Sequence, residues 1–118
     1  MYGHETPTRT ATVIGAVALL VGLLVSYAES AAVHKPRRHE VRIEGFEFQP
    51  RTLRAAVGDT VVWINQDIVP HTATDSAGKW DSGSLQKNES WKYVVRARGN
   101  HKYLCALHPT MKGSIVVP

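Results

Sequence analysis

The sequence contains only one cysteine, Cys105, in 118 residues. A single cysteine cannot form an internal disulfide, so the chain is not a disulfide-stabilised scaffold. A strong excess of one charge is also lacking: 14 Lys and Arg against 10 Asp and Glu leave a net charge of only +4, and no basic stripe with interleaved aromatic residues is present. The composition therefore argues against nucleic-acid binding. The length allows one domain and excludes a large multidomain enzyme.

Motifs of enzymatic catalysis are missing as well. Asp75, Asp81, Ser82 and Ser84 are the obvious candidates, but no nucleophile elbow, paired carboxylates or phosphate-binding loop accompanies them. The Asp-Ser-Gly clusters in which they lie are typical of turns. We therefore expect the protein not to be an enzyme.

Residues 11–28 contain no charged side chain, and Ser26-Tyr27-Ala28 places small residues where a signal peptidase would cleave. The pattern predicts that residues 1–28 are an export signal, removed after Ala28. The alternative is a retained membrane anchor, because residues 11–28 as a helix would span about 27 Å against a hydrocarbon core of about 30 Å. In either case the remaining chain is periplasmic or otherwise extracytoplasmic, and it meets a membrane only if the segment is retained.

Residues 29–39 are polar and basic and include Pro36, so we expect a linker. Residues 40–118 contain short alternating runs that predict β-strands over 41–48, with an irregularity at Gly45, and over 53–57, 60–64, 90–97, 101–105 and 113–117. Residues 65–83 predict a long irregular connection. Short strands at this spacing predict an all-β fold, a Greek-key β-sandwich, preceded by the N-terminal signal or anchor helix.

Cys105, His108 and Met111 follow one another at intervals of three residues, between the last two predicted strands. A loop this tight can direct a thiolate, an imidazole and a thioether to one point. A second imidazole is available at His71, directly after Pro70. Two His, one Cys and a weakly bound Met are the ligand set of a blue-copper site, and this mixture of donors accepts both Cu(I) and Cu(II). Zinc is the alternative metal, but methionine is a poor zinc ligand.

The other histidines lack this context. His4 and His34 are interpreted as leader or linker residues, His39 as a strand-edge residue and His101 as a residue near a turn. We therefore leave all four outside the predicted metal site.

Further segments carry motifs of their own: Phe46-Glu47-Phe48-Gln49-Pro50, Val57 to Asn65, Pro70-His71-Thr72, Trp80 to Gly83, and Tyr103 through to Gly113. With them, residues 40–118 resemble the cupredoxins, and within that family the amicyanin and plastocyanin group. The two-residue gap between His108 and Met111 is similar to the short ligand loop of amicyanins. The resemblance implies one type 1 copper ion held by His71, Cys105, His108 and Met111. Thr72 departs from the pattern, because many cupredoxins have Asn there to tie the ligand loops together.

The resemblance implies a one-electron carrier that cycles between Cu(I) and Cu(II) and passes electrons between periplasmic redox partners. The edge of His108 would reach the surface through an apolar patch formed with Pro70, Leu107 and Pro109. Amicyanin-like proteins suggest a dehydrogenase as donor and a c-type cytochrome as acceptor, and we expect a monomer. Two alternatives stay open: a periplasmic copper-binding or delivery protein with the same ligands, and a copper oxidase or reductase, which would need a second copper centre that the sequence does not show.

Overall fold

The computed structural model describes Gly3 and residues 33–118. The predicted export signal or anchor, residues 1–28, therefore lies outside the described residues apart from Gly3, as do residues 29–32 of the predicted linker. In the described part of the chain, no helix has the length and apolar character needed to cross a membrane. Residues 33–118 belong to one compact unit.

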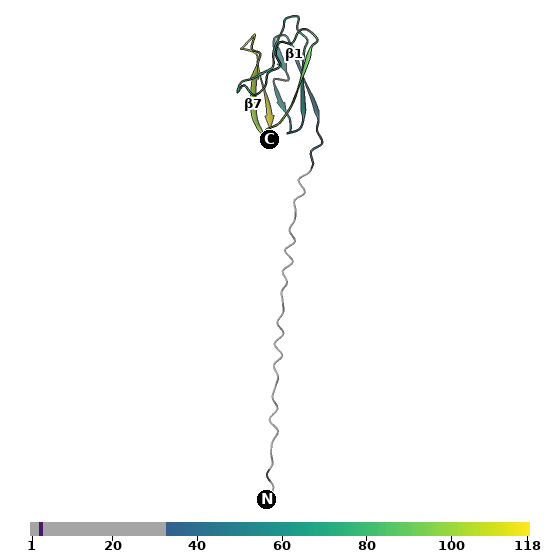
Figure 1. The fold of residues 1–118 in the computed structure, drawn as a ribbon, viewed down its shortest axis with the longest axis vertical. Helices are drawn as coiled ribbons and strands as arrows, with labels where there is room; N and C mark the ends of the chain where they lie inside the picture. Colours follow the sequence, from purple (N-terminus) through teal and green to yellow (C-terminus); the bar gives the residue numbers. More distant parts are fainter. Residues whose placement is uncertain (1–2, 4–32) are drawn as a thin grey trace. The chain divides into compact units, whose positions relative to one another are not determined.

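Two four-stranded sheets make up this unit, and Figure 1 shows β1 and β7, one strand from each sheet. The first sheet has the order β2-β1-β4-β6 and the second the order β3-β8-β7-β5. Strands β1 and β4 pair in parallel within the first sheet, and β3, which lies between them in the chain, belongs to the second sheet. The chain therefore crosses from one sheet to the other, and β3 pairs there in parallel with β8. The predicted all-β sandwich is confirmed. The strands are β1 (Arg38–Glu44), β2 (Glu47–Gln49), β3 (Thr52–Arg54), β4 (Thr60–Asn65), β5 (Thr74–Asp75), β6 (Ser90–Val94), β7 (Gly99–Leu104) and β8 (Lys112–Val117).

The predicted single strand over 41–48 is wrong in one respect, because the chain reverses at its middle. Gly45 and Phe46 both have positive φ, 61° and 59°, and β1 and β2 pair as an antiparallel hairpin around them. Glycine adopts this conformation without steric cost, whereas Phe46 does not. The turn therefore carries strain at Phe46, which the contacts described below offset.

Between the sheets lies a cluster of aromatic rings, which we call the aromatic cluster. Alternation along β4 directs Trp63 into this interior, where it is fully buried. Its ring centroid lies 5.3 Å from that of Trp80, 5.6 Å from that of Trp91 and 5.4 Å from that of Tyr103. Tyr93 stacks on Trp80 at 5.0 Å. Aromatic side chains supply large buried areas, so this cluster is a main source of packing energy for the sandwich.

Strands β7 and β8 pair along their length, and at one position a side chain of β7 lies directly over the backbone of β8. Gly113 lies opposite Tyr103 in the antiparallel register, and a Cβ added at Gly113 would overlap the phenol ring. Burial raises the pKa of Tyr103 to about 12, so the phenol stays neutral. The glycine is thus required by the ring that covers it.

The buried carboxylate of Asp59 holds the last residues of the predicted linker against the first sheet. Asp59 Oδ1 accepts hydrogen bonds from His34 Nε2 at 2.6 Å and from the backbone N–H of Arg37 at 2.9 Å, and Oδ2 accepts from His39 Nε2 at 2.7 Å and from the Ala56 N–H at 3.0 Å. These groups form what we call the Asp59 cluster. His34 and His39 therefore have a structural role that sequence interpretation did not give them, and β1 begins at Arg38, inside the predicted linker.

Candidate metal centre

The loop after β7 folds because two successive turns close it. The N–H of His108 donates to the Cys105 carbonyl at 3.2 Å, and the N–H of Met111 donates to the His108 carbonyl at 2.9 Å. The Cys105 N–H in turn donates to the Met111 carbonyl at 3.1 Å, which brings both ends of the loop together. The three-residue spacing noted in the sequence thus corresponds to one turn for each interval.

His71 is positioned from the other side of the site by Asn65, at the end of β4. The Asn65 amide donates to the carbonyls of Val69 at 2.9 Å and of Leu85 at 2.8 Å. His71 and Leu85 also exchange two backbone hydrogen bonds, at 2.8 and 3.1 Å. These bonds hold the backbone around His71, and the His71 side chain is fully buried.

The donor atoms of His71, Cys105 and His108 all lie within 4.8 Å of one another. Cys105 Sγ is 3.6 Å from His71 Nδ1 and 3.7 Å from His108 Nδ1. Metal–sulfur and metal–nitrogen bonds of about 2.3 and 2.0 Å, meeting at about 120°, would separate sulfur from nitrogen by about 3.7 Å. The pocket formed by the three residues therefore fits a trigonal metal ion.

The structure brings the fourth predicted ligand, Met111, to the same loop. Its side chain is buried, and its backbone closes the loop on both sides. The assignment of its thioether as the axial ligand stays a prediction. His101 does not join the site: its Nε2 lies 2.7 Å from the Ala97 carbonyl.

Thr72 connects the two halves of the site. Its backbone N–H donates to Cys105 Sγ at 3.3 Å, and its Oγ1 accepts the N–H of Ala106 at 2.7 Å. The hydroxyl also contacts Thr74 Oγ1 at 2.8 Å. Although Thr72 departs from the family pattern, its hydroxyl thus ties the two ligand loops together, and the N–H at the sulfur stabilises negative charge on a thiolate.

Asp67 is a residue of the site that sequence interpretation missed. Its Oδ2 accepts a hydrogen bond from His71 Nε2 at 2.8 Å, and the carboxylate also accepts the N–H groups of Gly45 at 2.8 Å and Phe46 at 3.0 Å. Burial alone would raise the pKa of Asp67, but these donors outweigh it and hold the pKa below its usual value. The Nε2 bond leaves Nδ1 of His71 free of its proton and available to a metal. The only sequence signal was an acidic residue four positions before His71.

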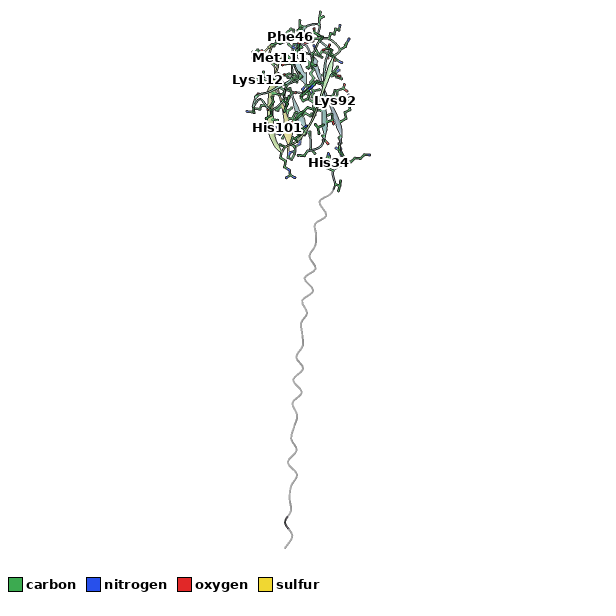
Figure 2. All side chains as sticks on the ribbon, viewed as in Figure 1. His34, Phe46, Lys92, His101, Met111 and Lys112 are labelled. Carbon is green, nitrogen blue, oxygen red and sulfur yellow. The ribbon has the colours of Figure 1, made fainter. Side chains whose placement is uncertain are left out.

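Phe46 is the second missed residue, and Figure 2 shows it at the same end of the domain as Met111. Its ring centroid lies 5.2 Å from that of His71 and 5.1 Å from that of His108, with the rings nearly perpendicular. Half of the Phe46 side chain is exposed, and Leu107, next to His108 in the chain, is exposed to a similar extent. Phe46 therefore places an exposed apolar ring beside His108, and the patch formed with Pro70, Leu107 and Pro109 stays a prediction.

Comparison with known proteins gives a consistent result. The family model for copper-binding proteins of the plastocyanin/azurin family matches residues 37–118. Amicyanin-alpha of Methylorubrum extorquens is 30% identical over 105 residues, which cover 85% of this chain and 85% of that protein. Amicyanin of Paracoccus denitrificans is 32% identical over 82 residues, covering 65% of this chain and 63% of the relative.

Solved structures agree with the sequence relatives. The oxidised form of a methionine-to-leucine variant of amicyanin superposes with a TM-score of 0.65 at 28% identity, covering 68% of this chain and 81% of that one. A copper-containing nitrite reductase from Thermus scotoductus gives the same TM-score at 26% identity, but the match covers only 23% of its chain. The similarity to that enzyme is thus confined to one part of it.

Proposed function

Because the chain belongs to the plastocyanin/azurin family of copper-binding proteins, we propose that it is a one-electron carrier in which His71, Cys105, His108 and Met111 would hold the copper ion. The observation that carries this proposal is the trigonal arrangement of the three donor atoms, with sulfur-to-nitrogen distances of 3.6 and 3.7 Å. The cofactor is one type 1 copper ion, which when bound supplies a Cu(I)/Cu(II) couple.

The protein contributes rigidity and access. Hydrogen bonds donated by Asn65 and Thr72, and one that Asp67 accepts from His71, hold the site, so its metal-binding atoms need little rearrangement between oxidation states. His71 and Cys105 are fully buried, whereas His108 is only partly buried and lies beside the exposed ring of Phe46. The edge of His108 is therefore the route by which we propose that electrons enter and leave.

We further propose that the protein works outside the cytoplasm, as a monomer, with a dehydrogenase as electron donor and a c-type cytochrome as acceptor. The apolar run over residues 11–28 supports export, and the amicyanin relatives support redox partners. Copper delivery is the competing function. Burial of His71 and Cys105 favours the carrier, because ready transfer of a metal requires accessible ligands.

The optical and electron paramagnetic resonance spectra of the full chain with one equivalent of Cu(II) test the proposal. A Cu(II)–thiolate centre gives an intense absorption at about 600 nm, and the Cys105→Ala variant should lack it. A Cys105→Ala protein that stays blue would contradict the proposed copper site. A wild-type chain that binds only colourless Cu(I) and gives it up to a chelator would contradict the proposal of an electron carrier.

A further inference from the structure

Three hollows lie next to one another at the surface. The first, of about 310 Å³, lies beside His108 and Met111 and is also lined by residues of β2, and the second, of about 450 Å³, lies over β7 and β8. These two share the lining residues Arg51 and Lys112. A third, of about 300 Å³, shares Ser76 and Lys102 with the second. We call these three adjacent hollows the basic groove.

Cations that are scattered in the sequence are gathered here by the fold. The residues that give the groove its charge are Arg51, Lys79, Arg98, Lys102 and Lys112. Strand alternation explains part of this, because Lys102 and Lys112 are exposed while their neighbours Tyr103 and Gly113 face inward. Within residues 33–118, none of the five cations takes part in an ion pair.

Acidic groups do not cancel this charge. Of the lining residues, Glu47 lies at the His108 end, and Asp75 is buried with its carboxylate bound to the backbone N–H of Lys79. The middle hollow has no carboxylate at all. The charge on β1 of the first sheet is balanced instead. Its exposed side chains alternate between positive and negative, in the order Arg38, Glu40, Arg42 and Glu44, and Arg38 forms an ion pair with Glu40.

We propose that the basic groove docks an acidic segment of the redox partner, whose Asp and Glu carboxylates lie on Arg51, Lys102 and Lys112. This inference rests on the proposed function, because the groove leads to the edge of His108. Long-range attraction by unpaired cations speeds encounter, and the small apolar rim of Phe46 and Leu107 permits fast release. Charge thus orients the partner, and the rim sets the contact through which the electron passes.

Binding of hexaglutamate to the metal-free full chain tests the groove without relying on copper. In an NMR titration at low salt, we expect shifts at the amides of Arg51, Lys102 and Lys112. The Lys102→Glu variant should weaken this binding about tenfold, whereas Lys92→Glu, on the other sheet, should not (Figure 2). Shifts centred near Lys92, equal effects of the two variants, or tighter binding of an oligothymidylate of the same charge would overturn an acidic protein partner.

Oxidation of the copper-loaded Cu(I) form by small redox reagents tests the link to His108. Lys102→Glu should slow the reaction with anionic hexacyanoferrate(III) several-fold and leave the cationic tris(phenanthroline)cobalt(III) unaffected or faster, with Lys92→Glu close to wild type. Arg51→Gln provides a second variant with the same expected direction. A chain without the blue absorption would refute the proposed function while the hexaglutamate result stands, and equal slowing of both reagents would refute the groove as the electron-transfer approach.

Discussion

A single carboxylate, Asp67, links the imidazole of His71 to the strained turn at Phe46. Its negative charge makes the His71 ligand more basic and so favours Cu(II) over Cu(I). We predict that Asp67→Asn raises the reduction potential, by about 60 mV if the relative affinity for Cu(II) falls tenfold. A spectroelectrochemical titration measures this directly.

The control for Asp67→Asn is Glu44→Gln, which removes an exposed carboxylate at the end of β1 without touching His71. An equal shift in both variants would mean that charge in general, and not the hydrogen bond to His71, sets the potential.

The hydroxyl of Thr72 accepts the N–H of Ala106 and so fastens the Cys105 loop to the His71 loop. Thr72→Val removes this acceptor with little change in shape, and the loss of one partly buried hydrogen bond costs about 0.5–1.5 kcal/mol. We predict that Thr72→Val lowers the unfolding free energy by this amount, as measured by urea denaturation, while Thr72→Ser stays within about half of that loss. Equal losses in both variants would contradict a role for the hydroxyl.

Strands β7 and β8 depend on the absence of a side chain at Gly113. Because a Cβ there would overlap the ring of Tyr103, Gly113→Ala should destabilise the domain by about 1–3 kcal/mol. Ser114→Ala, at the next position of β8, should change stability little. Thermal unfolding followed by circular dichroism compares the two, and a Gly113→Ala protein as stable as wild type would show that the ring moves aside freely.

The Asp59 cluster holds the residues before β1 and predicts a dependence of stability on pH. Burial alone would raise the pKa of Asp59, but the N–H of Ala56, His39, the N–H of Arg37 and His34 outweigh it, so the pKa lies below that of an unfolded carboxyl group. A lowered pKa stabilises the fold above the unfolded value of about 3.9, and this contribution is lost as the pH falls toward the folded value. Asp59→Asn should therefore cost about 1–3 kcal/mol near neutral pH.

The cost of Asp59→Asn should shrink as the pH falls below about 4, because the carboxyl group of the unfolded wild-type chain then binds a proton before the folded one does, which favours unfolding. Urea denaturation at neutral and at acid pH measures the difference between wild type and variant. A difference that is the same at both pH values would show that the charge of Asp59 contributes nothing.

At the level of the elements, the strands with regular alternation were predictable from the sequence, and β4 and β8 lie where expected. The spacing Cys105, His108 and Met111 likewise identified the loop, because it maps onto local turns. The reversal at Gly45 and Phe46 was not predictable, because a carboxylate 21 residues later stabilises it. The roles of Asp67, Phe46 and the Asp59 cluster could not be predicted for the same reason, because they depend on contacts that only the tertiary fold creates.

For the whole molecule, the described unit indicates where a shortened chain can begin. A chain that starts at Val33 keeps His34 and His39 on Asp59, whereas one that starts at Glu40 loses both imidazoles and the first two residues of β1. We predict that the first folds and takes up copper, and that the second is less stable by about 1–3 kcal/mol. Calorimetry of the two chains checks this, and equal melting temperatures would place the start of the domain at residue 40.

The aromatic cluster has a consequence for the optical properties of the protein. All three tryptophans of the chain, Trp63, Trp80 and Trp91, lie within it, with ring centroids 5.3 to 5.9 Å apart. At such separations excitation passes between the indoles faster than they emit, so their fluorescence behaves as one signal. Trp63 also packs on Tyr103, two residues before Cys105, which brings that signal close to the copper. The intrinsic emission should therefore be quenched when copper is bound, and so report metal occupancy without any added dye.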